Sequence, residues 1–164
     1  MALTPAQRTT LAAHIRANTD PAVVTALSTR NDTKLAELYN SASSFIVWKK
    51  SIPTSDVGVT VNYIAVEAMT DANRTRITTF YAMNPVSFAP RSDIRSFWAN
   101  TFSGALGGEG QNTRDALEAL WRRAALLVEK VFATGTGTTV APGDLTFEGT
   151  ATIEDIGRAL NDNP

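Results

Sequence analysis

The side chains that could take part in catalysis are few and scattered along the chain. His14 is the single histidine, and no cysteine is present. Asp115 and Glu118 lie three residues apart and would share one side of a helix as a pair of carboxylates. A nucleophile with its base, or a histidine metal site, needs further partners that the sequence does not display. We therefore expect a non-enzymatic protein with no cofactor and no metal site.

Structural roles explain the carboxylates better than acid–base chemistry does. We expect Asp115 in the first turn of a helix, where the helix dipole favours a negative charge. Glu118 precedes Arg122 by four residues, a spacing that favours an ion pair. Glu154 and Asp155 are expected in the first turn of a C-terminal helix for the same reason as Asp115.

Basic residues offer a different chemistry, which is contact with phosphates or carboxylates. Lys49 and Lys50 follow Trp48, a faint resemblance to a nucleic-acid contact. The net charge of −1 argues against a dedicated nucleic-acid binder, although a local basic patch stays possible. The stronger candidates for partner or DNA-channel contacts are Arg114, Arg122, Arg123 and Lys130.

Most of these basic residues lie in the longest helical pattern of the chain, Thr113–Phe132. Leu117, Trp121 and Val128 recur at spacings that place them on one helix face. Alanines add helix propensity, and about twenty residues predict a rod of roughly 30 Å. We expect this helix to be the central element of the core.

A segment rich in glycine and threonine follows that helix and must end it. Gly135 and Gly137 accept backbone conformations that stop a helix, and Pro142-Gly143-Asp144 is typical of a turn. Residues 134–149 are therefore expected to form a short β-hairpin or an extended arm. Its apolar side chains are the candidate assembly contacts: Val140, Leu145 and Phe147.

Other segments supply shorter elements. Phe45–Trp48 has the composition of a strand, and for 57–68 a helix with a kink at Gly58 is favoured over a strand. Four glycines between Ser103 and Gln111 predict a mobile loop. Further helices are expected after these cap or start positions: Thr4, Asp20, Asn31, Thr70 or Asp71 (ended by Asn84-Pro85), Ser92 or Asp93, and Thr152.

The composition fits one globular domain. The chain has 164 residues, of which 43% are hydrophobic and 19% charged. It shows no apolar signal core and no apolar run of about 18 residues, so we expect a soluble protein without a membrane segment. The expected fold is mainly α: a compact helical bundle around one long central helix, with the hairpin or arm at 134–149 and a short helix and tail at 152–164.

The order of segments resembles the head–tail connector (adaptor) proteins of tailed bacteriophages. The similar stretches are LTPAQRTTLAAHI, the DPA and LAELYN helices, FIVWKKSIPTSDVG, SDIRSFWANTFSG, the long helical pattern with FATGTGTTVAPGDLTFEG, and TIEDIGRAL. They cover most of the chain and are structural signatures without catalytic content. Val57–Val61 and the glycine-rich loop are the parts least similar to the family.

The resemblance implies a structural virion protein, made in the host bacterial cytoplasm and located at the head–tail interface. Such proteins form a ring, of perhaps a dozen subunits, that docks on the portal protein and provides the surface for the tail. DNA would pass through the ring without sequence-specific binding. Two alternatives stay open: a minor capsid or tail-completion protein, and a small helical DNA-binding or regulatory protein, which the net charge disfavours.

Overall fold

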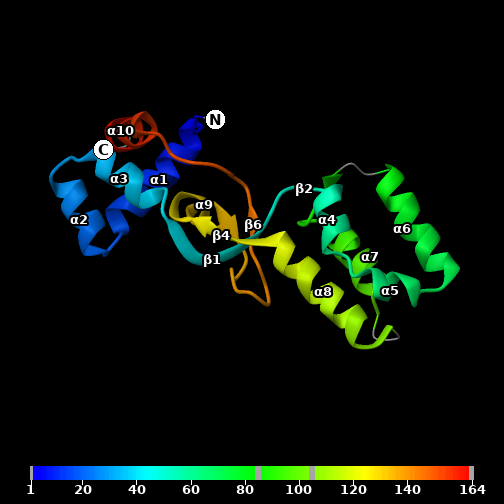
Figure 1. The fold of residues 1–164 in the computed structure, drawn as a ribbon. Helices are drawn as coiled ribbons and strands as arrows, with labels where there is room; N and C mark the ends of the chain where they lie inside the picture. The colour runs from blue at the N-terminus through cyan, green and yellow to red at the C-terminus, as the bar shows by residue number, and fades with distance from the viewer. Residues whose placement is uncertain (1, 84–85, 104–105, 163–164) are drawn as a thin grey trace. The chain divides into compact units, whose positions relative to one another are not determined.

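The computed structural model describes residues 2–83, 86–103 and 106–162 (Figure 1). It is mostly helical with a few short strands, so the mainly α fold class is confirmed. The chain forms two compact units, which we describe separately. Unit 1 comprises Met1–Val47 and Ala124–Pro164, and unit 2 comprises Trp48–Arg123. This is a finer division than the single domain expected from the sequence.

Unit 1 is built on short helices, most of which begin after an expected capping residue. In α1, Thr4 accepts a hydrogen bond from the Gln7 backbone, while the Gln7 side chain accepts one from the Thr4 backbone. Asp20 and Asn31 cap the next two helices in the usual way. The helices are α1 (Pro5–Ala17), α2 (Pro21–Ser28), α3 (Asp32–Tyr39), α9 (Leu127–Val131) and α10 (Ile153–Asp162).

The core of unit 1 joins segments from both ends of the chain. Leu11 and Ile15 of α1 pack in one cluster with Leu35 of α3 and with Ile156 and Leu160 of α10. The C-terminal helix therefore completes the core formed by the N-terminal helices (Figure 1).

Unit 2 has its own core, which is rich in aromatic residues. Trp98 is buried and packs edge-on against Phe80 and Phe97 and in parallel with Phe102. Strand β2 (Ile52–Pro53), near the start of the unit, pairs antiparallel with β3 (Val86–Ser87), near the middle of its sequence. The helices are α4 (Thr54–Thr60), α5 (Tyr63–Glu67), α6 (Asp71–Met83), α7 (Ser92–Thr101) and α8 (Gly107–Trp121).

Two local expectations for unit 2 are met only in part. Residues 57–68 are helical, as favoured, but the break falls at Val61-Asn62 between α4 and α5 and not at Gly58. The loop predicted at 103–111 is wrong from Gly107 onward, because these residues form the first turns of α8. A Cβ at Gly110 would lie 2.8 Å from the Cβ of Leu106. Because glycine has no Cβ, the first turn of α8 can pack this closely on Leu106. Gly104 and the predicted stop at Asn84-Pro85 lie outside the described residues.

The long central helix predicted at Thr113–Phe132 is wrong. Helix α8 ends at Trp121, and the chain then runs as strand β4 (Arg122–Leu126) before α9 begins. Consequently Asp115 lies well inside α8 and not in its first turn. The single apolar stripe read from the sequence serves two cores, with Trp121 in that of unit 2 and Val128 in that of unit 1.

Tertiary hydrogen bonds explain why helix propensity fails here. Strand β4 pairs with β1 (Ala42–Trp48), which has the strand-like composition noted in the sequence. The Ser41 carbonyl accepts a hydrogen bond from the Leu127 amide at 2.9 Å, and the Trp121 carbonyl accepts one from the Lys49 amide at 2.8 Å. These partners satisfy the backbone groups that a continued helix would have paired internally.

Two buried carboxylates hold the returning C-terminal segment in unit 1. Glu129, only 2% exposed, accepts the Leu126 amide at 2.9 Å and the Gly149 amide at 3.0 Å. Asp155, 3% exposed, accepts the Leu3 amide at 3.0 Å and caps its own helix through Thr152. Because a buried charge is costly without donors, both contacts constrain where residues 148–155 can lie.

Asp155 should make unit 1 sensitive to acid. Burial by itself raises the pKa of Asp155, but hydrogen bonds from Thr152 and Leu3 and the charge of Arg8 together hold this pKa below its usual value of 3.8. As pH falls, the unfolded state therefore takes up a proton first, and the stabilisation from Asp155 is lost below about pH 4. We expect Asp155→Asn to lower the free energy of unfolding by about 1–3 kcal/mol at pH 7, with a smaller difference at pH 3.

Urea titrations followed by circular dichroism at both pH values measure this difference. The matched control is Glu154→Gln, whose carboxylate forms only an exposed ion pair with Arg158 and should contribute less than about 1 kcal/mol. An equal loss for Asp155→Asn at pH 7 and pH 3 would contradict the assigned role of its charge.

Candidate interaction surfaces

The segment after α9 folds back as a closed hairpin, which is the first of the two forms expected from the sequence. Strand β5 (Ala133–Thr134) pairs antiparallel with β6 (Asp144–Leu145). At the tip, the Thr138 amide donates to the Ala141 carbonyl at 3.1 Å, and the Ala141 amide donates to the Thr138 hydroxyl at 3.0 Å. The four residues 138–141 thus form a tight turn with its own hydrogen bonds.

The hairpin is anchored to β1 within unit 1. The Ile46 amide donates to the Gly137 carbonyl at 2.7 Å, and the Gly143 amide donates to the Ile46 carbonyl at 2.8 Å. The Phe45 ring lies against both glycines: an added Cβ would come within 2.1 Å of it at Gly137 and within 2.5 Å at Gly143. Glycine is therefore required at both positions for this close approach.

The three apolar residues assigned to the arm have different environments. Val140 stands at the tip and is 92% exposed. Leu145 is half-buried in β6, and Phe147 is buried in the core of unit 1, where its ring packs edge-on against Phe132. Of the three, Val140 is the side chain exposed to solvent in this conformation.

The four basic candidates have different environments and belong to different units. Arg122 makes the expected ion pair with Glu118 and lies 5.6 Å from the centre of the Trp48 ring. Arg114 bonds to Gln111 on its own helix, and Arg123 is half-buried. Lys130 is exposed in unit 1, whereas the three arginines belong to unit 2.

Trp48, considered as a nucleic-acid contact, already has cationic neighbours in unit 2. The Arg95 guanidinium lies 4.4 Å from the ring centre and also donates to the Ala89 carbonyl. With Arg122 also near the ring, these arginines stabilise Trp48 through cation–π contacts. A base could stack on Trp48 only by displacing them.

His14 has a packing role in unit 1. Its Nδ1 lies 2.8 Å from the Tyr39 hydroxyl, and the two rings meet edge-on. Burial and the nearby charge of Lys130 lower the pKa of His14. Within residues 2–83, 86–103 and 106–162, no group of three His, Cys, Asp or Glu side chains could hold a metal ion. No helix of the described chain is long and apolar enough to cross a membrane.

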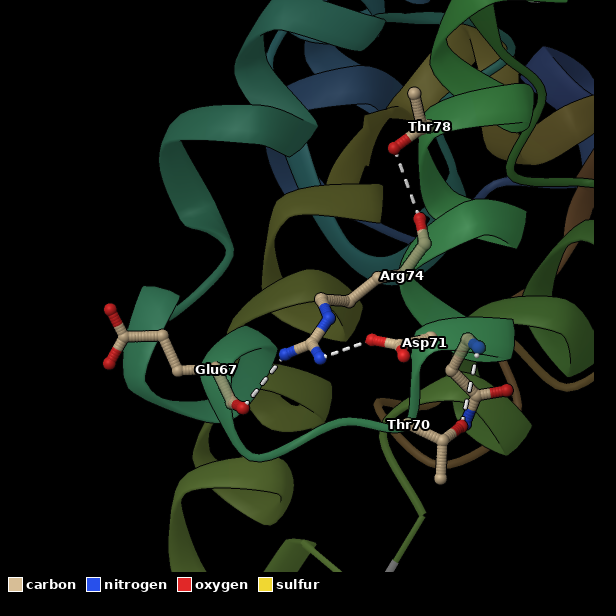
Figure 2. Close-up of polar contacts among 6 residues, drawn as sticks. Glu67, Thr70, Asp71, Arg74 and Thr78 are labelled. Atoms are coloured by element: carbon tan, nitrogen blue, oxygen red, sulfur yellow. Dashed lines mark hydrogen bonds and ion pairs between the residues drawn. The ribbon is translucent and has the colours of Figure 1, made fainter.

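Helix α6 of unit 2 presents an outer surface that the sequence did not single out. The helix buries only Ile77 and Phe80. At its start, Arg74 donates to the Glu67 carbonyl at 3.0 Å and to the Asp71 carboxylate at 2.5 Å, as Figure 2 shows. Arg76, two residues later, is exposed, and no hydrogen bond or ion pair joins its guanidinium to another residue that the structure describes.

An apolar pocket opens on the same helix, beside Arg76. Its volume is about 340 Å³. Phe80 of α6 and Phe97 of α7 are stacked with ring centres 5.0 Å apart, and Met83 is 73% exposed. The pocket is lined by Thr75, Arg76, Thr79, Phe80, Met83 and Phe97.

Comparisons of the chain with protein-family models, with curated proteins and with solved structures each found no match. Function is therefore inferred from the contacts of this chain and from the resemblance noted in its sequence.

The Phe45 contact yields a prediction for the hairpin. Gly143→Ala places a methyl group 2.5 Å from the ring and 2.5 Å from the Thr134 carbonyl, so the hairpin must shift. We expect a loss of about 1–3 kcal/mol in the free energy of unfolding, measured by urea titration. Gly108→Ala is the control, because its Cβ meets nothing within 4 Å and alanine favours the helix. Equal stability of the two variants would contradict the packing of Phe45 on Gly143.

Proposed function

We propose that this protein is a structural subunit of a tailed-bacteriophage particle: a head–tail connector that forms a ring on the portal and receives the tail. The observation that carries the proposal is the anchored hairpin. A tight turn, held on β1 by hydrogen bonds and by Phe45, presents Val140 to solvent. An exposed apolar side chain on a rigid support is typical of an assembly contact.

The division of charge between the two units supports the same proposal. Unit 1 has six Lys and Arg residues against nine Asp and Glu, whereas unit 2 has nine against seven. The formal charges are therefore −3 and +2. Units of opposite net charge within one chain favour contacts between unlike units of neighbouring copies, and such heterologous contacts close into rings when the rotation between subunits allows.

The proposal places the protein in the virion, without a reaction, a cofactor or a membrane contact. Its partners are further copies of itself, the portal protein and a tail or tail-completion protein. Arg114, Arg122 and Arg123 become candidates for the DNA-facing side only if this region of unit 2 lines the channel, where they would act on phosphates irrespective of sequence.

Binding to isolated portals tests the proposal. We expect the purified chain to co-sediment with purified portal rings and to saturate at about twelve copies per portal, since a closed ring has a fixed number of subunits. Capsid shells assembled without portal are the control and should bind none.

The two alternatives predict different results. A capsid-decorating protein would bind the portal-free shells, with many copies per particle. A DNA-binding protein would instead form a complex with duplex DNA that weakens steeply as salt rises from 50 to about 200 mM. Either result, with no binding to the portal, would overturn the connector proposal.

A further inference from the structure

The hairpin carries an exposed apolar side chain at its tip and an exposed acidic side chain in β6. Val140 is 92% exposed, although valine side chains are usually buried. Asp144 lies four residues later, at the start of β6, and is also exposed. Its backbone carbonyl accepts a hydrogen bond from the Thr134 hydroxyl, but its carboxylate forms no hydrogen bond or ion pair within the part of the chain that the structure describes.

The pocket between α6 and α7 combines an apolar lining with a basic side chain, which complements the apolar and acidic side chains of the hairpin. The stacked rings of Phe80 and Phe97 line it, together with the exposed Met83. Arg76 is one of the lining residues and forms no hydrogen bond or ion pair with another residue that the structure describes, whereas Arg74 on the same helix bonds to Asp71 (Figure 2). At about 340 Å³ the pocket is larger than one valine side chain.

We propose that the pocket formed by α6 and α7 receives the hairpin tip, residues 138–141, of a second copy of this chain, with Arg76 pairing with Asp144 of that copy. Val140 then fills the apolar pocket, and the charges of Arg76 and Asp144 neutralise each other at its edge. The inference rests on the proposed function, because it specifies the contact between neighbouring subunits of the ring.

Charge and symmetry identify the occupant as another copy. The tip belongs to the acidic unit and the pocket to the basic unit, so the same two surfaces recur on every copy. A contact between two different surfaces of identical chains is heterologous, and such contacts repeat around a ring. The tip also enters at little entropic cost, because its turn is already formed by hydrogen bonds of Thr138 and Ala141.

Cross-linking between two single-cysteine variants tests the contact, since the natural chain has no cysteine. Val140→Cys and Thr79→Cys change exposed side chains, so both variants should fold. The two variants are mixed, once in free solution and once bound to portal rings. Each mixture is then treated with a short bismaleimide. We expect a product at twice the chain mass of 17.6 kDa in the mixture, with about tenfold less in either variant alone.

Charge exchange tests the rim of the pocket. Arg76→Glu in the Thr79→Cys chain, or Asp144→Lys in the Val140→Cys chain, should lower the yield about tenfold, and combining the two changes should restore it. Arg74→Gln, two residues away on α6, should leave the yield unchanged because Arg74 is already engaged by Asp71.

The outcomes separate this inference from the proposed function. Binding to the portal without the mixed cross-link would overturn the hairpin contact and leave the connector proposal standing. A mixed cross-link without portal binding would support the contact and overturn the connector. A third chain carries both cysteines. If it gives a cross-linked product at the mass of one chain, the tip lies in the pocket of the same chain, and the inference is overturned.

Discussion

The pairing of β1 with the segment after Trp121 is the interaction on which the rest of this structure depends. Without the hydrogen bonds to Ser41 and Lys49, residues 113–132 would follow their helix propensity and form one continuous helix. With them, the apolar stripe is divided, and Trp121 and Val128 enter different cores. The division also turns α9 so that Glu129 becomes a buried acceptor, which fixes the chain at Gly149.

The same strand supports the hairpin. Ile46 of β1 exchanges hydrogen bonds with Gly137 and Gly143, while Phe45 fills the space that the glycines leave. A segment whose composition resembles a flexible linker is in this way held as a defined tip. Rigidity matters for assembly, since a contact made by an ordered loop loses less conformational entropy than one made by a mobile arm.

Local signals in the sequence predicted much of the fold, and non-local contacts account for the failures. Capping residues such as Thr4 located helix starts correctly, and the turn chemistry of Pro142-Gly143 indicated the hairpin. The burial of Glu129 could not be predicted, because its partners lie in segments that only the tertiary fold brings together. Arg76 and Met83 gave no signal either, since the pocket that they line also includes Phe97 of α7, which only the tertiary fold brings close.

The proposed function assigns this chain to a ring whose subunits meet through the ordered hairpin. A cryo-electron microscopy reconstruction of the complete phage particle, made without imposed icosahedral symmetry, is the most direct measurement of its central claim. The account predicts density for this chain as a single ring at one vertex, between portal and tail. Density distributed over the capsid lattice, or absent from the particle, would contradict it.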